Sequence, residues 1–275
     1  MKTFLVTEDT NLKDFTDSNF PQGSFCFSAL LKGKDIKVNG VRTDKNMPLK
    51  SGDEVVYYTT AKQESKPSHN LVYEDENIYI AEKHSGVSSE GLFSELRSKG
   101  EYYAVHRLDR NTQGLIIYAK TQEAEDELLQ AFKQRKIVKT YIALCKNAFN
   151  EKEATLTAYH KKDAELVKIF ERPEKGAEKI ITEYRVEEEI GDIALVKIIL
   201  HTGKTHQIRA HMAFIGCPVL GDEKYGDEAL NAKYNARRQR LIAKYLAFDL
   251  DGRLSYLNGK IFESSLSFDN PFHGK

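Results

Sequence analysis

The sequence predicts an α+β protein with two parts: a large domain on a mixed or antiparallel sheet, and a small α+β domain before it. Most segments after position 70 read as strands, with few strand–helix alternations. The polar stretch AKQESKPSHN at 61–70 reads as a linker. A chain of 275 residues, 40% of them hydrophobic, can form such a core. We expect domains at 1–60 and 71–275, joined by a linker at 61–70.

The first domain is predicted from a helix, a hairpin and a strand. SFCFSALLKG reads as a short helix that ends at Gly33. DIKVNGVRT reads as a tight hairpin, with Asn39-Gly40 as its turn. LKSGDEVVYYTT gives a second turn and a strand. The region from Lys32 to Lys50 carries six basic residues against Asp35 and Asp44.

The second domain is predicted mainly from strands. The helix TQEAEDELLQAFKQRK starts at Thr121 and has an apolar stripe. A second helix, THQIRAHMAFIG, is expected to be capped by Thr205 and to end at Gly216. The expected strands are LVYEDENIYIAEK (two strands around a polar turn), GLIIYAK, IVKTYIALC, KIITEYRVEEEI, DIALVKIIL, YLAFDL and LSYLNGKIF.

Composition excludes several classes of protein. No apolar run is long enough for a transmembrane helix, and the first residues lack the apolar stretch of a signal peptide. Three cysteines, far apart in sequence, argue against a disulfide framework and fit a cytoplasmic protein. The 41 basic and 41 acidic residues balance, but residues 131–150, 201–220 and 229–248 carry bases and no acid. Such segregation can present a positive surface to phosphates, although each stretch alone can also be a solvated face.

Asp109 is the first candidate for chemistry, in the segment HRLDRNTQGL. It lies between Arg107 and Arg110. A carboxylate beside guanidinium groups stays ionised and oriented, as a nucleophile or general base must. A salt-bridged turn is the alternative from this segment alone.

Two further segments add candidates. If VKTYIALC is a strand, Lys139 and Tyr141 share one face, where they suit a phosphate and a stacked base. In HTGKTHQIRAH, the predicted helix buries the apolar stripe that begins at Ile208. Arg209 lies off this stripe and can therefore reach a carboxylate outside the helix. His206 and His211 are five residues apart, about 140° around a helix, so we expect no metal site.

Together these segments resemble the RluA family of RNA pseudouridine synthases. HRLDRNTQGLIIYAK is similar to the family's aspartate motif, with Gln113 where serine is usual. VKTYIAL is similar to its tyrosine motif, and HTGKTHQIRAHMAFIGCPVLGDEKYG to its third motif. EKHSGVSS and RLIAKYLAFD resemble the early and late motifs more weakly. The N-terminal order of elements resembles the S-four-type RNA-binding domain, without that family's arginine ahead of LLK.

The resemblance implies a pseudouridine synthase fold and an isomerase that needs no cofactor or metal. It implies that Asp109 is the essential carboxylate, that Arg209 pairs with it, and that Tyr141 stacks on the target uracil, which must be flipped out of its helix. Arg107 would fill the space that the base leaves. The substrate would be ribosomal or transfer RNA, and no protein partner is indicated, so we expect a monomer. The other residues expected to bind RNA are His106, Lys139, Lys32, Lys34, Lys37 and Arg42.

Two alternatives remain from sequence. One is an RNA-binding protein without catalytic activity, against which the intact set of Asp109, Tyr141 and Arg209 argues. The other is an unrelated hydrolase, for which no nucleophile motif or metal set is present.

Overall fold

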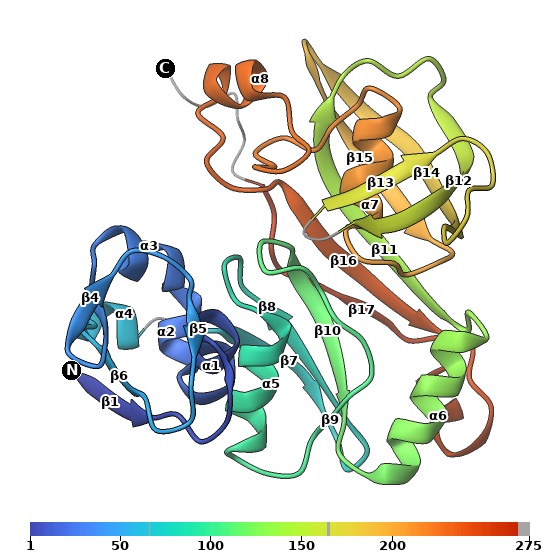
Figure 1. Ribbon diagram of the computed structural model, residues 1–275. Coiled ribbons are helices and arrows are strands. Elements are labelled where there is room, and N and C mark those ends of the chain that lie inside the picture. Colours follow the sequence, from blue (N-terminus) through green and yellow to red (C-terminus); the bar gives the residue numbers. More distant parts are fainter. Residues whose placement is uncertain (66, 164–165, 269–275) are drawn as a thin grey trace.

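The computed structural model describes residues 1–65, 67–163 and 166–268 (Figure 1). The N-terminal unit is a four-stranded antiparallel sheet in the order β1-β6-β3-β4, packed with helices. Its elements are β1 (Lys2–Leu5), β2 (Thr10–Asn11), α1 (Leu12–Asn19), α2 (Pro21–Phe25), α3 (Phe27–Lys32), β3 (Ile36–Val38), β4 (Val41–Thr43), β5 (Pro48–Leu49), β6 (Glu54–Tyr57) and α4 (Ala61–Glu64).

The expected hairpin is present as β3 and β4. Asn39 and Gly40 both have positive φ, 49° and 80°, as a two-residue turn of this kind requires. The expected first helix is split at Cys26 into α2 and α3, and α3 ends at Gly33 as expected. The unit has its own apolar core, formed by residues such as Leu12, Leu30 and Ile36.

The remaining strands form one eleven-stranded sheet. Nine of them follow the order β13-β12-β14-β15-β11-β16-β10-β8-β7, while β17 pairs with β16 and β9 with β10. The strands are β7 (His69–Glu74), β8 (Ile78–Lys83), β9 (Tyr103–Ala104), β10 (Gln113–Ala119), β11 (Ile137–Lys146), β12 (Glu153–Asp163), β13 (Leu166–Phe170), β14 (Glu178–Ile190), β15 (Ile193–Leu200), β16 (Leu241–Phe248) and β17 (Ile261–Glu263).

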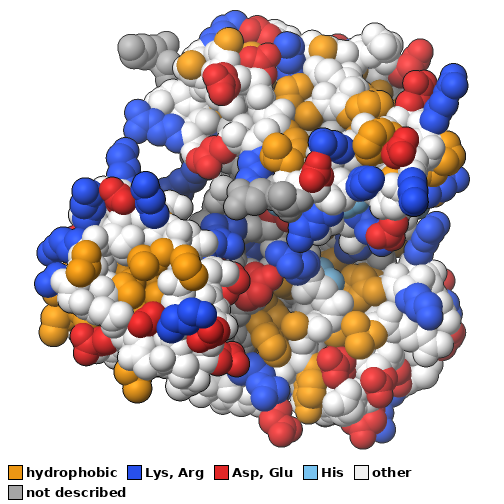
Figure 2. All heavy atoms as spheres, in the orientation of Figure 1, with side chains coloured by type: hydrophobic (Ala, Val, Ile, Leu, Met, Phe, Trp, Pro, Cys, Tyr) orange, Lys and Arg blue, Asp and Glu red, His pale blue; other side chains and the backbone are white. Residues whose placement is uncertain are grey.

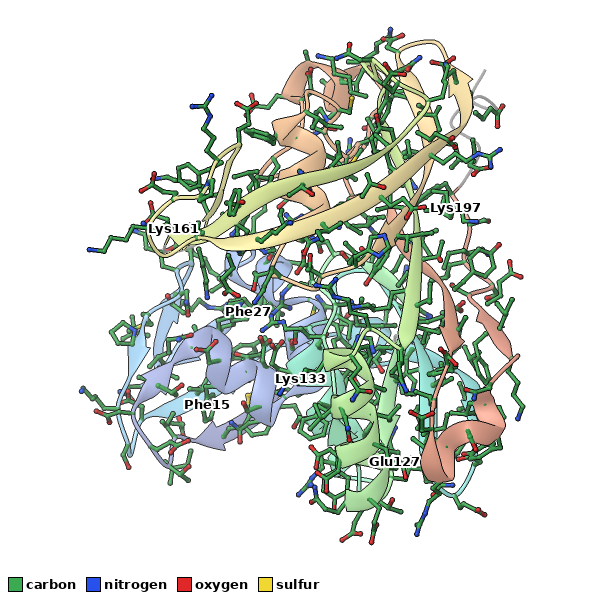
Figure 3. All side chains as sticks on the ribbon, turned by 90° about the vertical axis from the view of Figure 1, so that its right-hand side faces the viewer. Phe15, Phe27, Glu127, Lys133, Lys161 and Lys197 are labelled. Carbon is green, nitrogen blue, oxygen red and sulfur yellow. The ribbon has the colours of Figure 1, made fainter. Side chains whose placement is uncertain are left out.

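Helices cover both faces of this sheet. They are α5 (Ser89–Arg97), α6 (Gln122–Lys133), α7 (Gln207–Phe214), α8 (Glu228–Lys233) and the 3₁₀ helix η1 (Gly252–Leu257). In β10, Leu115 and Ile117 pack into the core under α6, while Ile116 and Tyr118 pack into the core shared by α5 and α7. In Figure 3, Phe15 and Phe27 mark the N-terminal unit, and Lys133 lies at the end of α6 nearer the long strands, with Glu127 further down the helix.

The sheet is antiparallel except at one central pair, β10 and β16, so the expected mixed sheet is confirmed. Gly114 opens this pair with a φ of 106°. A Cβ there would lie 2.3 Å from the Ala243 carbonyl oxygen. The glycine of the HRLDRNTQGL segment therefore lets β10 approach β16 immediately after the Asp109 loop.

Two local predictions are wrong. Thr205 does not cap α7: His206 is the residue before the helix, in the left-handed region (φ 54°), with no side-chain cap bond. Of the strand expected over residues 254–262, only the end is present, in β17, while residues 252–257 form η1, because the Glu127 carboxylate on α6 accepts the N–H groups of Arg253 and Leu254. Residues 61–70, expected as a linker, contain α4 and the start of β7. The expected end of the second domain, residues 269–275, lies outside the described residues. Among the residues described, no helix is long and apolar enough to cross a membrane.

Candidate active site

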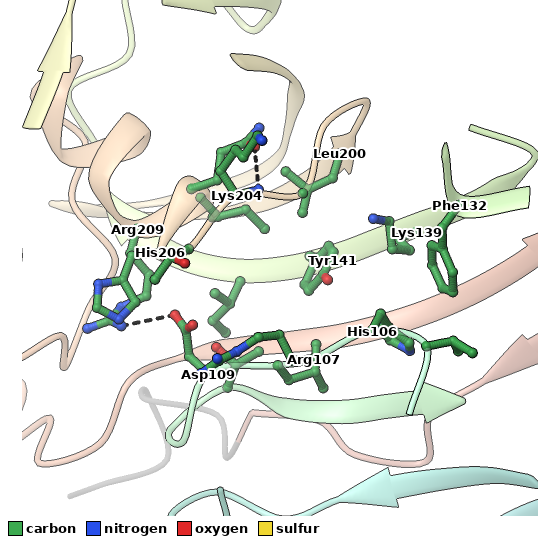
Figure 4. Close-up of a pocket in the computed structure, with 18 of the residues that line it drawn as sticks. His106, Arg107, Asp109, Phe132, Lys139, Tyr141, Leu200, Lys204, His206 and Arg209 are labelled. Carbon is green, nitrogen blue, oxygen red and sulfur yellow. Dashed lines mark hydrogen bonds and ion pairs between the residues drawn. The ribbon is translucent and has the colours of Figure 1, made fainter. Parts of the chain in front are cut away.

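A cleft of about 400 Å³ brings the three sequence segments together (Figure 4). Its walls come from the loop before β10, the start of β11, the end of α6 and the turn that leads into α7. Six of the residues expected at the site line it: His106, Arg107, Asp109, Lys139, Tyr141 and Arg209.

The backbone of the Asp109 loop is fixed on both sides of the carboxylate. Before it, the Ser89 hydroxyl exchanges two hydrogen bonds with the backbone of Leu108, at 2.8 and 2.9 Å. After it, the Arg110 carbonyl accepts from the Gly86 N–H at 3.0 Å and from Lys83 Nζ at 3.1 Å. Because Ser89 and Lys83 are buried and anchor the loop on both sides, Asp109 is presented from a rigid loop.

Arg209 joins two carboxylates. Its Nη1 donates to Asp109 Oδ2 at 3.0 Å, while Nε and Nη2 donate to Asp222 Oδ2 and Oδ1 at 2.6 and 2.9 Å. The expected pairing of Arg209 with Asp109, a hundred residues apart, is thus present. Burial is the largest single effect on the pKa of Asp222 and would raise it, but the hydrogen bonds and charge of Arg209, together with the N–H groups of Lys224 and Tyr225, lower it overall. The guanidinium is therefore held by Asp222 and oriented toward Asp109.

Sequence reasoning placed Arg209 on the polar side of its helix. In the structure it is 7% exposed, because β13 and β14 pack on α7 and leave little of the helix open. Ile208 and Met212 are buried as expected. An arginine in such surroundings needs carboxylates as partners, and Asp109 and Asp222 provide them.

Tyr141 and Lys139 lie on the same face of β11, as strand alternation predicts, and both line the cleft. Burial, and then the charge of Asp109, raise the pKa of the Tyr141 phenol. Tyr141 is therefore neutral and can donate its proton in a hydrogen bond. Lys139 Nζ lies 5.3 Å from the centre of the Phe132 ring, and burial lowers the pKa of its amine.

His106 is a neutral part of the cleft wall. Its Nε2 accepts the N–H of Ile117 at 3.0 Å, and its ring packs on Phe132 with centroids 4.8 Å apart. Burial lowers the pKa of His106 to about 3, so this ring offers no positive charge to a phosphate near neutral pH.

The two arginines beside Asp109 point to different partners. Arg107 is exposed and pairs with Glu90 at 3.1 Å, at the start of α5. Arg110, which had no predicted role, donates to both oxygens of Asp17 in the N-terminal unit, at 2.9 and 3.0 Å.

The four expected RNA-binding residues of the N-terminal unit are not brought to this cleft. Lys32 and Lys34 are exposed on that unit, and Lys34 pairs with Asp44 at 3.4 Å. Lys37 and Arg42 lie over the ring of Tyr58, 5.5 and 5.0 Å from its centre.

Sequence reasoning missed several residues that shape the site. Asp222 was within the third motif, but only the structure shows its bond to Arg209. His206 lines the cleft, and its Nδ1 lies 2.9 Å from the Tyr225 hydroxyl. That hydroxyl also accepts the N–H of Val167, at 2.9 Å. No group of three or more possible metal ligands occurs among the described residues.

Comparisons with known proteins identify the family of this chain. The model of the RNA pseudouridylate synthase family matches residues 58–214. An uncharacterized RNA pseudouridine synthase of Aquifex aeolicus is 32% identical over 247 residues, 80% of this chain and 78% of that protein. The ribosomal large subunit pseudouridine synthase C of Rickettsia bellii is 28% identical over 233 residues, 73% of this chain and 77% of that one.

The fold has solved counterparts. The human RNA pseudouridylate synthase domain containing 1 structure superposes with a TM-score of 0.57 at 24% identity, covering 74% of this chain and 84% of that one. The family model matches more than half of the chain, and Asp109, Tyr141 and Arg209 all lie within the matched residues. The chain belongs to the RluA-type family of RNA pseudouridine synthases.

Proposed function

We propose that this RNA pseudouridine synthase acts on uridine in large-subunit ribosomal RNA, with Asp109 as its essential carboxylate. The observation that carries the role is the position of Asp109, on a fixed loop and paired with Arg209 in a cleft floored by Tyr141. The names of relatives such as the Rickettsia bellii enzyme support ribosomal RNA over transfer RNA.

The reaction sets what the residues must do. The bond between C1′ of the ribose and N1 of uracil breaks, the base turns, and a bond between C1′ and C5 forms, while the C5 proton is lost and N1 gains one. Asp109 would act as a nucleophile, or as a base toward the ribose. Arg209 would keep it ionised and in one rotamer. Tyr141, neutral and buried at the floor, would stack on the uracil and assist the proton transfer.

RNA contacts would come from cations around the cleft. Lys139 lies within it, and Arg107 is exposed at its edge, where a planar guanidinium can stack in the space left by the flipped base. His106 would contribute its ring rather than a charge. Both walls of the cleft belong to one chain, which supports action as a monomer. A ribosomal RNA substrate and three cysteines outside disulfides support a cytoplasmic site of action.

We also propose that residues 1–60 are an RNA-binding domain of the S-four type. The support is the helix α3, the hairpin β3–β4 with its tight turn, and two cations over one aromatic ring, Lys37 and Arg42 at Tyr58. Lys32 and Lys34, exposed nearby in sequence, would add phosphate contacts. Replacing Lys37 and Arg42 with alanine should weaken binding to ribosomal RNA, and an unchanged Kd would contradict the assignment.

The central experiment compares wild type with Asp109→Asn on unmodified bacterial large-subunit ribosomal RNA and on transfer RNA, with pseudouridine detected by mass spectrometry. Wild type should modify the ribosomal RNA, and Asp109→Asn should not. Asp126→Asn is the control, since Asp126 is exposed on α6 and lines neither wall. Equal RNA binding with no pseudouridine from either protein would indicate an RNA-binding protein without activity. Modification of transfer RNA alone would overturn the ribosomal assignment.

A further inference from the structure

A second cleft, of about 540 Å³, opens from the same loop as the first. The two clefts share Arg107, Asp109, His206 and Arg209. The far wall of the second is the N-terminal unit, through Lys13 and residues 24–29. An RNA strand that places one base beside Asp109 can therefore continue along this wall.

The N-terminal wall is held by the catalytic loop itself. Arg110 follows Asp109 and forms a two-bond ion pair with Asp17, and its Nη1 also donates to the Ser24 carbonyl at 2.6 Å. The hydroxyls of Ser24 and Ser88 lie 3.1 Å apart, and Ser94 donates to the Ser18 carbonyl. These contacts fix the position of α1 and α2 relative to Asp109.

The second cleft is positively charged although the whole chain is neutral. Among the described residues that line it, seven are Lys or Arg and four are Asp or Glu. Arg107, Arg110 and Arg209 are paired with Glu90, Asp17 and Asp109, which accounts for three carboxylates. Beyond these pairs, Lys13, Arg237 and Arg238 lie in the described lining together with one further carboxylate, Glu223. Figure 2 shows Lys and Arg side chains on both sides of the hollow between the N-terminal unit and the rest of the molecule.

Arg237 and Arg238 are exposed, but their backbone is fixed. Gly221 has a φ of 75°, and a Cβ there would lie 2.0 Å from the Arg238 carbonyl oxygen. Next to it, Arg240 N–H donates to the Leu220 carbonyl at 2.8 Å. Asp222 follows Gly221 and holds Arg209. The turn at Gly221 therefore positions both the loop that carries the two arginines and the arginine of the active site.

We propose that the second cleft binds the phosphates of the single-stranded RNA that flanks the target uridine, with the N-terminal unit as one wall of the substrate site. This rests on the proposed action on RNA and adds the path of the strand. An RNA fits better than an acidic protein because the cleft continues into one that takes a base, and because its cations lie on two facing walls. A flipped uridine leaves its neighbours unpaired, which suits a single strand.

The test measures the binding of a fluorescein-labelled oligouridylate of about 12 nucleotides at several salt concentrations. Each phosphate contact to a single strand adds about 0.7 to the slope of log affinity against log salt. Arg237→Ala with Arg238→Ala should lower the slope by about 1.4, and Lys13→Ala, on the opposite wall, by about 0.7. Arg172→Ala with Arg253→Ala is the matched control, since both side chains are exposed and line neither cleft.

A slope that falls equally in the cleft variant and the control variant would overturn the proposal, as would a slope unchanged in the cleft variant. Polyglutamate that competes as well as RNA would overturn the assignment to RNA. The binding assay does not require catalysis, so it is separate from the pseudouridine assay. Slopes that change as expected while wild type forms no pseudouridine would support the cleft and contradict the proposed reaction.

Discussion

Asp222 holds Arg209 with two hydrogen bonds, 2.6 and 2.9 Å long, and leaves one guanidinium nitrogen for Asp109. The Asp222 side chain has no exposed surface, and that of Arg209 is 8% exposed. The catalytic carboxylate proposed here is thus oriented by an arginine that is itself oriented by a second, buried carboxylate.

Asp222→Asn should therefore lower kcat without a matching change in RNA affinity. Asparagine accepts one of the two bonds, so Arg209 loses its fixed orientation, and kcat should fall about 10- to 100-fold. Pseudouridine kinetics and oligouridylate binding should be measured together. Asp227→Asn, which changes a carboxylate that caps α8, is the control. A fall in affinity with kcat unchanged would contradict a positioning role.

Asp17→Ala should loosen the N-terminal unit without unfolding the large sheet. The Asp17 side chain is 7% exposed and its partner Arg110 is 24% exposed, so the pair is partly buried and its loss should cost about 1–3 kcal/mol. Hydrogen exchange should quicken in α1 and α2 and stay unchanged in β10 and β11.

The surface pair between Lys34 and Asp44 gives a control for the Asp17 variant. Both side chains are about half exposed, so Asp44→Ala should cost less than about 1 kcal/mol. If Asp17→Ala and Asp44→Ala change hydrogen exchange equally, Arg110 does not hold the unit in place.

Gly114→Ala should destabilise the protein far more than an ordinary glycine substitution. A Cβ at Gly114 meets backbone atoms of Ala243 at 2.3 and 2.8 Å, so β10 and β16 must separate. Gly259→Ala is the matched control, since Gly259 also has positive φ, 75°, but nothing lies within 4 Å of its added Cβ. The control should cost about 1 kcal/mol from backbone strain, and Gly114→Ala at least about 3 kcal/mol in urea unfolding. Equal costs would show that the close approach is unimportant.

The sequence predicted which residues lie at the site better than it predicted their contacts. Asp109, Tyr141 and Arg209 could be assigned because each lies in a motif, and the bond from Arg209 to Asp109 followed from their expected roles. The partner of Arg110 could not be found, because Asp17 lies 93 residues away in another unit and no local pattern joins the two.

The local errors have the same origin in tertiary contacts. Residues 254–262 alternate like a strand, but the Glu127 carboxylate fixes the start of η1. Thr205 has the side chain of a helix cap, but its carbonyl accepts a hydrogen bond from His160 Nε2 at 2.8 Å, and the chain turns at His206. Tertiary partners override local preference at both places.

Acid should destabilise the protein below about pH 6.5 through His211. This side chain is 1% exposed, and burial lowers its pKa to about 4. Between its unfolded pKa of 6.5 and about pH 4, the unfolded chain binds a proton that the folded chain does not, so stability falls as pH falls. The loss from this one residue should reach about 3 kcal/mol.

The variant His211→Asn isolates this effect. The Thr182 hydroxyl lies 3.0 Å from His211 Nδ1 and also accepts from Gln207; an asparagine side chain can donate or accept the bond to Thr182 without titrating. Urea unfolding at about pH 7.5, 6.0 and 5.0 should show a shallower loss of stability in the variant than in wild type. His106, whose pKa is lowered to about 3, still titrates in both proteins, so some acid sensitivity should remain in the variant. Parallel losses of stability would show that His211 binds its proton equally well in the folded and unfolded chains.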